Sequence, residues 1–185
     1  MNLAPSEERE HLKLALELSG LPEVEVALPE TRHVVVHGMR LHYLDWGGSG
    51  RPILFLHGGG LNARTWDVVC LALRAEYHCI ALDQRGHGDS EWSPESDYSA
   101  EAHFRDVEGF VDLVGFDRLL IVGQSMGAMN GFVYATRHAD RLRGLVLIDA
   151  GPNIRTQGAQ RIGEFIGQTA EADSIDDLVK KALLF

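Results

Sequence analysis

The sequence predicts an α/β fold, with a mostly parallel sheet that is opened by an antiparallel hairpin and covered by helices on both faces. Two observations predict it. Apolar strand-like runs alternate with helix-like stretches between Ile53 and Ile148, and strands that are apolar on every side are typical of parallel sheets buried on both faces. In the middle of this alternation an apolar run breaks at Gly123, presents Ser125 and restarts as a helix-compatible stretch.

Composition limits the class of protein. A chain of 185 residues with 45% hydrophobic content is long enough for one domain with a sizeable core. The net charge of −10 argues against nucleic acid or an anionic membrane surface as a partner. Cys70 and Cys79 fit buried thiols in a reducing compartment. The amino terminus is acidic and no apolar run reaches membrane-spanning length, so we expect a cytoplasmic protein.

Residues 1–30 are predicted to form an N-terminal helix and loop. Between Ser6 and Ser19, leucines alternate as they would on a strand, but the surrounding Glu, Lys, Ala and Arg residues favour a helix. Pro22 and Pro29 then indicate a loop.

Residues 31–152 are predicted to form a core of about six strands. It opens with a hairpin, because β-branched and aromatic residues flank His37-Gly38. Ser99 can cap a helix whose apolar residues recur at helical spacing as far as Val114. The predicted strands are 34–36, 41–44, 53–56, 78–82, 119–122 and 145–148, and the other predicted helices are 63–75 and 126 to about 138.

Residues 153–185 are predicted to be the start of a helical cap, which is incomplete. A helical stretch lies around Ile162 to Ile166, and Ser174 with Asp177 resembles the start of a second helix with a capping box. Both helices would be amphipathic.

Ser125 is the candidate nucleophile. A serine lifted clear of its strand sits on a strained turn, where a Cβ at Gly123 or Gly127 would collide with its neighbours. The N–H of Met126 would open the following helix and could donate to an oxyanion, with the positive end of the helix dipole behind it. The alternative interpretation is an ordinary glycine-rich turn between a strand and a helix.

Two further loops follow predicted strands. His57-Gly58-Gly59-Gly60 would let backbone N–H groups approach a bound oxygen without side-chain interference, and it resembles the oxyanion loop of lipases and esterases. Asp83-Gln84-Arg85-Gly86-His87-Gly88-Asp89-Ser90 follows the next strand. We expect Asp83 and Arg85 to hold that loop together rather than to act in catalysis.

With the serine turn, these loops complete a resemblance to the α/β-hydrolase family, running from about Val34 to Pro152. The resemblance implies that Ser125 is the nucleophile and that the N–H groups of Gly59 and Met126 form the oxyanion hole. It implies a hydrolase that acts by acyl transfer on a small-molecule ester or related carbonyl substrate, without a cofactor or metal.

The chain departs from the family in its catalytic base. The family's base is a histidine after the last strand, but none of the 9 histidines follows His138. The resemblance therefore implies a chain truncated before the last two strands. His57 and His87 are weak substitutes for the base, and Asp149 is either a triad acid or a turn-capping residue.

This gap leaves three functions open. The complete protein, or an assembly that supplies a histidine, could be a serine hydrolase. A catalytically incomplete chain could bind a small apolar ligand or a partner chain. The fold could also perform carbon–carbon hydrolysis or halide chemistry. Because 145–148 would be an unpaired apolar edge strand, we expect a second copy or a complementing chain to pair there.

Overall fold

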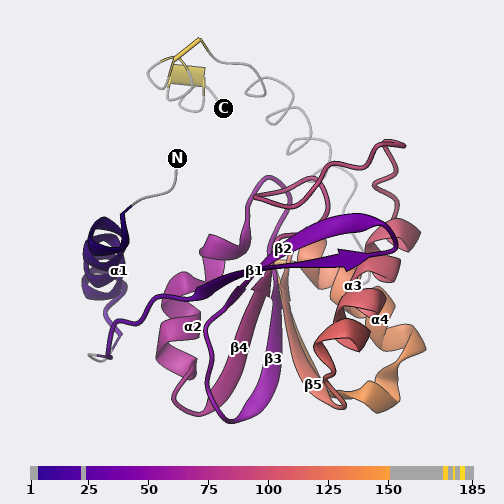
Figure 1. The fold of residues 1–185 in the computed structure, drawn as a ribbon, viewed down its shortest axis with the longest axis horizontal. Coiled ribbons are helices and arrows are strands. Elements are labelled where there is room, and N and C mark those ends of the chain that lie inside the picture. The colour runs from indigo at the N-terminus through magenta and orange to yellow at the C-terminus, as the bar shows by residue number, and fades with distance from the viewer. Residues whose placement is uncertain (1–3, 22–23, 151–172, 175–176, 178–179, 182–185) are drawn as a thin grey trace. The chain divides into compact units, whose positions relative to one another are not determined.

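A computed structural model describes residues 4–21, 24–150, 173–174, 177 and 180–181 (Figure 1). The chain divides into two compact units, Met1–Ala150 and Gly151–Phe185. The first unit holds the sheet. The predicted boundaries at residues 30 and 152 stay predictions.

The sheet of the first unit has six strands in the order β1-β2-β4-β3-β5-β6. β1 pairs antiparallel with β2, and β2 pairs antiparallel with β4, whereas β4, β3, β5 and β6 are parallel to one another. This confirms the predicted parallel sheet opened by a hairpin. The strands are β1 (Glu30–Val36), β2 (Met39–Asp45), β3 (Arg51–Leu56), β4 (Tyr77–Leu82), β5 (Leu119–Gln124) and β6 (Leu142–Ile148).

The helices agree with the predicted ones except near residue 63. There the chain first makes a 3-10 turn, in which the side chain of Asn62 accepts a hydrogen bond from the N–H of Arg64, and only then continues as an α-helix. The helices are α1 (Pro5–Ser19), η1 (Ala63–Trp66), α2 (Asp67–Leu73), α3 (Ala100–Val114), α4 (Met126–Arg137) and η2 (Ala139–Arg141).

Helices cover both faces of the sheet (Figure 1). Because side chains alternate along a strand, Leu54 and Leu56 of β3 pack in one apolar cluster with residues of α3 and α4. Ile53 and Phe55 belong to a second cluster with residues of η1, α2 and α1. A strand buried on both sides has no polar position, which explains the uniformly apolar runs of the sequence.

Helix α3 begins and ends as its sequence predicts. The Ser99 hydroxyl accepts a hydrogen bond from the N–H of Ala102 at 3.2 Å, and Gly115 ends the helix with φ 74°. The buried face of α3 carries the predicted residues Phe104, Val107, Phe110 and Val111.

Helix α1 is a helix, as predicted, although its leucines alternate as on a strand. It buries Leu12 against the second cluster, whereas Leu14 and Leu18 are exposed. Arg9 donates a hydrogen bond to the carbonyl oxygen of Val26 at 2.8 Å, which ties α1 to the segment that leads into β1. None of the helices in the described part of the chain is long and apolar enough to cross a membrane.

In the second unit, the Ser174 hydroxyl accepts a hydrogen bond from the N–H of Asp177 at 3.1 Å. This is the first half of the capping box that the sequence predicts there. The helix predicted around residues 162–166 lies outside the described residues.

Cys70 and Cys79 are free and buried, as predicted, and burial raises the pKa of the Cys70 thiol. Both side chains are fully buried, and a thiol that a reagent cannot reach does not react, whatever its pKa. We therefore expect a disulfide reagent such as DTNB to modify neither cysteine in the native protein at pH 8, and to modify both once the protein is unfolded in guanidinium. Rapid modification of one thiol without unfolding would contradict this packing.

Candidate active site

Ser125 stands at the junction of β5 and α4 in a conformation that few non-glycine residues adopt. Its backbone has φ 48° and ψ −111°, and such angles cost about 1–3 kcal/mol and persist only where the surroundings impose them. Two hydrogen bonds hold this residue. Its N–H donates to the carbonyl oxygen of Ile148 at 2.9 Å, and its own carbonyl oxygen accepts from the N–H of Met129 at 3.1 Å.

The glycines on either side of Ser125 are needed because the backbone passes so close. A Cβ at Gly123 would lie 2.6 Å from the Cα of Ala128, and a Cβ at Gly127 would lie 2.6 Å from the carbonyl oxygen of His57. Real Cβ atoms do not approach other atoms so closely. The fold therefore leaves no room for a Cβ at Gly123 or Gly127, as the sequence predicts.

The glycine loop after β3 lies beside the serine turn. A Cβ at Gly58 would lie 3.6 Å from the Cβ of Ser125, and a Cβ at Gly59 would lie 4.0 Å from the Cβ of Met126. As the first residue of α4, Met126 has an N–H without a carbonyl partner inside the helix. The structure thus brings Ser125, Gly59 and Met126 to one edge of the sheet.

His57 supports this loop and is unavailable as a base. Its Nδ1 lies 2.8 Å from the carbonyl oxygen of Gly58, and its Nε2 accepts a hydrogen bond from the N–H of Gln84 at 3.0 Å. The Gln84 side chain in turn donates to the carbonyl oxygen of His57 and accepts from Asn130, each at 2.7 Å. Burial lowers the pKa of His57. Both ring nitrogens are engaged in these contacts within the loop. The interpretation of His57 as a substitute for the catalytic base is therefore wrong.

Asp83 holds its loop together, as the sequence predicts. Its carboxylate accepts hydrogen bonds from the N–H groups of Ala63 at 2.6 Å and Asp89 at 2.9 Å, and lies 2.7 Å from Nδ1 of His42. Burial alone would raise the pKa of Asp83, but the hydrogen bonds from His42 and the two backbone groups lower it. The carboxylate is therefore a structural centre of the loop.

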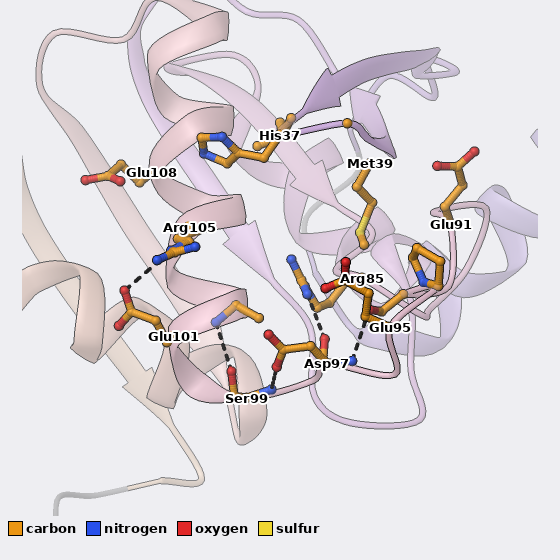
Figure 2. Close-up of a pocket in the computed structure, with 15 residues that line it drawn as sticks. His37, Met39, Arg85, Glu91, Glu95, Asp97, Ser99, Glu101, Arg105 and Glu108 are labelled. Atoms are coloured by element: carbon orange, nitrogen blue, oxygen red, sulfur yellow. Dashed lines mark hydrogen bonds and ion pairs between the residues drawn. The ribbon is translucent and has the colours of Figure 1, made fainter.

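Arg85 ties the same loop to helix α3. Its guanidinium donates to both carboxylate oxygens of Asp106 at 2.6 and 2.7 Å, and both side chains are buried. It also donates to the carbonyl oxygen of Asp97 at 2.7 Å, a bond drawn in Figure 2. The sequence predicts the tying role of Arg85 but gives no signal for its partner Asp106, which lies 21 residues away.

Three other polar residues that the sequence analysis named have different surroundings. His87 is half-buried, with Nδ1 2.9 Å from the carbonyl oxygen of Arg85 and its ring centroid 5.1 Å from that of His57. His138 is half-buried, and its Nε2 lies 2.6 Å from the Glu108 carboxylate. Asp149 is exposed, with φ 53°.

Sequence reasoning missed several buried polar residues around these loops. Gln84 and Asn130 link the glycine loop to α4, and His42 and Ser90 link β2 to the loop of Asp83. The one sequence feature that could have indicated two of them is that Gln84 and Ser90 lie in the loop after β4, at the edge of the sheet where ligand sites of α/β folds lie.

His103 is a further buried residue that the sequence did not predict. Burial, together with the charges of Arg85, His87 and His57, lowers its pKa to about 4. In the unfolded chain the imidazole takes up a proton near pH 6.5. The folded protein therefore keeps this contribution to its stability above pH 6.5 and loses it as the pH falls from about 6.5 toward 4.

We expect this loss to be about 2 kcal/mol in the free energy of unfolding. Urea unfolding at pH 7.5 and at pH 4.5 measures it. His103→Asn should lose less stability on acidification than the wild type, while His11→Asn, which removes an exposed imidazole, serves as the matched control. An equal acid-induced loss in the His103 variant and the wild type would contradict the prediction.

The cavity in Figure 2, of about 650 Å³, lies between the β1–β2 turn, residues 91–99 and α3. Its polar lining is largely acidic, with Glu91, Glu95, Glu101 and Glu108 among it. Ser125, Gly59 and Met126 are not among the described residues that line it.

Across the described residues there is no group of three His, Cys, Asp or Glu side chains that could hold a metal ion.

Comparison with known proteins places these loops in a family. The model of the alpha/beta hydrolase fold family matches residues 51–176. The chain is 32% identical over 143 residues to Esterase Rv0045c of Mycobacterium tuberculosis, which is 77% of this chain and 47% of that protein. It is 39% identical over 108 residues to haloalkane dehalogenase 2 of Mycobacterium bovis, 58% of this chain and 37% of that protein.

Among solved structures, an alpha/beta hydrolase from Novosphingobium aromaticivorans superposes with a TM-score of 0.72 at 29% identity, over 78% of this chain and 52% of that one. The chain spans less than half the length of the two curated relatives named above. The family model covers more than half of this chain and includes the glycine loop, the loop of Asp83 and the serine turn. The chain therefore belongs to the α/β-hydrolase family.

Proposed function

We propose that the protein is a hydrolase that acts on an ester or related carbonyl substrate by acyl transfer through Ser125. The observation that carries the proposal is the backbone of Ser125, which is held at φ 48° on the turn between β5 and α4, beside the loop of Gly58 and Gly59. Strained residues of this kind concentrate at functional sites. Esterase Rv0045c, a relative over 77% of this chain, supports an ester substrate.

The reaction follows from these groups. The Ser125 hydroxyl oxygen attacks the substrate carbonyl carbon as a base removes its proton, and the carbonyl electron pair moves onto the oxygen. The N–H groups of Gly59 and Met126 donate to that oxyanion. Its collapse expels the alcohol, which takes up the proton, and water then releases the acyl group by the same steps.

The chemistry of a serine favours a carbonyl substrate over an alkyl halide. Acyl transfer to serine gives an ester, which an activated water molecule can hydrolyse. Alkylation of serine by a haloalkane would give an ether, which water does not cleave under the same conditions. Haloalkane dehalogenase 2 is similar to this chain in sequence, but a serine nucleophile favours cleavage of an ester bond over cleavage of a carbon–halogen bond.

The proposal needs a base after the last strand of the sheet, and this sequence has no histidine after β6. All 9 histidines lie at or before His138, and His57 uses both of its ring nitrogens within the loop. We propose that the histidine comes from an additional segment or from a second chain. Asp149 follows Ile148, whose carbonyl oxygen accepts the N–H of Ser125, and it is the candidate acid.

Labelling with a fluorophosphonate tests the proposal, because only an activated serine reacts readily with it. The chain alone is expected to be inactive; in a sample that includes the segment or chain supplying the histidine, we expect one labelled site per chain, identified as Ser125 by peptide mass spectrometry. Ser125→Ala should abolish labelling, and Ser49→Ala, a change at an exposed serine, should leave it intact. Labelling that persists in Ser125→Ala would refute the assignment.

A second candidate function is that of a catalytically incomplete protein that binds a small apolar ligand or a partner chain. It is favoured by the missing histidine. A folded sample that never reacts with the fluorophosphonate, even at high reagent concentration, would support this function over acyl transfer.

We also propose that the free edge of β6 pairs with a second copy of the chain. Within the described residues β6 pairs only with β5, and Val146 and Ile148 are 47% and 41% exposed. Such an apolar edge favours strand pairing. Light scattering should show a dimer that Val146→Lys dissociates, and a monomer in the wild-type sample would contradict pairing between copies.

A further inference from the structure

The peptide unit between Gly58 and Gly59 is held in one orientation. The carbonyl oxygen of Gly58 accepts a hydrogen bond from the N–H of Leu61 at 3.2 Å and lies 2.8 Å from Nδ1 of His57. The backbone N–H of Gln84 donates to Nε2 of the same ring at 3.0 Å. A neutral imidazole has one donor and one acceptor nitrogen. The proton is therefore on Nδ1, and His57 donates it to the carbonyl oxygen of Gly58.

Holding this carbonyl group also sets the direction of the Gly59 N–H. The two groups belong to one trans peptide unit, which is planar, so they point in opposite directions. The N–H of Gly59 therefore points away from the ring of His57. Among the described residues, neither this N–H nor that of Met126 has a hydrogen-bond acceptor. These are the two donors of the proposed oxyanion hole.

Gln84 and Asn130 hold the glycine loop against helix α4. The side-chain amide of Gln84 donates to the carbonyl oxygen of His57 at 2.7 Å, and its Oε1 accepts from Nδ2 of Asn130 at 2.7 Å. Asn130 lies on α4, the helix that begins at Met126. His57, Gln84 and Asn130 are 0%, 2% and 4% exposed. A buried chain of hydrogen bonds therefore joins the residue before Gly58 to the helix that follows Ser125.

This arrangement does more than fill space in the core. Gln84 contacts His57 twice, because its backbone N–H fixes the tautomer of the ring and its side chain fixes the carbonyl group. Two apolar side chains of the same shape could replace Gln84 and Asn130 at little cost in stability. They could not fix the direction of the peptide unit that follows His57.

We propose that Gln84 and Asn130 are positioning residues, which orient the N–H of Gly59 relative to that of Met126 so that both donate to one oxyanion. The inference rests on the acyl-transfer function proposed above. A reacting group that is misplaced by about 1 Å can lower a rate about 10²-fold. The test therefore measures both the orientation of the Gly59 N–H and the rate of the reaction at Ser125.

Residual dipolar couplings measured by NMR report the orientation of each backbone N–H and do not require hydrolase activity. In the wild type, the coupling of Gly59 should fit the same molecular alignment as the couplings of β3 and α4. Gln84→Met and Asn130→Leu remove the hydrogen bonds at similar side-chain size. In either variant the coupling of Gly59 should depart from that alignment, while β3 and α4 still fit. Thr136→Ala, which removes an exposed hydrogen bond on the same helix, is the control and should change nothing.

Fluorophosphonate labelling of Ser125 gives the rate, in a sample that includes the segment or chain supplying the histidine. The maximal rate constant of labelling should fall about tenfold in Gln84→Met and in Asn130→Leu, because a displaced oxyanion donor costs less than the roughly 10²–10³-fold of a deleted one. The reagent concentration at half-maximal rate should change little. The double variant should be no slower than Gln84→Met, because Asn130 acts through Gln84. A merely structural role would lower the amount of folded protein and leave the rate constant of the folded fraction unchanged.

Circular dichroism first checks that each variant is folded. An unchanged Gly59 coupling or an unchanged labelling rate constant in a folded Asn130→Leu sample would overturn the positioning role. If neither variant folds, the wild type decides, because a Gly59 coupling that does not fit the alignment of α4 would also overturn it. No labelling of the wild type, together with a Gly59 coupling that changes in the variants, would instead count against acyl transfer and support the positioning of Gly59 by Gln84 and Asn130.

Discussion

Replacing Gly127 by alanine should destabilise the protein by about 3 kcal/mol, the upper end of what overpacking usually costs. The new Cβ would lie 2.6 Å from the carbonyl oxygen of His57. The atoms it meets are backbone atoms at the end of β3, which cannot rotate away as the end of a side chain can. The glycine loop would have to shift, and it would carry Gly59 with it.

Urea unfolding followed by circular dichroism measures this cost. Gly115→Ala is the control, because no atom lies within 4 Å of an added Cβ at Gly115, although its φ of 74° is positive, whereas Gly127 lies within helix α4. That variant should lose only about 1 kcal/mol, the cost of a left-handed backbone for alanine. Similar losses in the two variants would show that close packing at the serine turn is not what requires glycine.

Replacing Asp106 by alanine should cost still more, about 3–5 kcal/mol. The change leaves the guanidinium of Arg85 buried without its partner, because the side chains of Arg85 and Asp106 are only 9% and 4% exposed. The free energy of unfolding from urea titrations measures the effect. Glu101→Ala, which breaks the exposed pair with Arg137, should cost about 0.5 kcal/mol.

A double variant separates charge from packing in this prediction. Arg85→Met combined with Asp106→Leu removes both charges, so it should be more stable than Asp106→Ala alone. If the double variant is less stable than the single one, then hydrogen bonding to the loop, and not an unpaired buried charge, dominates the energy.

Most of the fold could be predicted because its strands and helices have local patterns. The strands of the parallel sheet are apolar on both faces, and Ser99 and Gly115 mark the two ends of α3. The start of β6 was harder to predict. The strand begins at Leu142, three residues before the predicted start, because the exposed Arg143 and the side-chain-free Gly144 interrupt the apolar run.

The candidate site divides in the same way. Ser125, its flanking glycines and the loop of Gly58 and Gly59 could be predicted, since each conformation depends on residues adjacent in sequence. The pairs Arg85–Asp106 and His42–Asp83 could not, because they join residues 21 and 41 positions apart. The role of an acid on a helix, or of a histidine in a strand, can be assigned only when the fold shows which residue it contacts.

The N–H of Ser125 donates a hydrogen bond to the carbonyl oxygen of Ile148. The orientation of the serine therefore depends on β6, the outermost described strand of the parallel part of the sheet. Outer strands held by one neighbour open more readily than central ones. Fraying at the tip of β6 would release the serine's backbone before the rest of the sheet loosens. A strand that pairs with β6 would therefore stabilise the backbone of Ser125 and restrict the orientation of its side chain without contacting it.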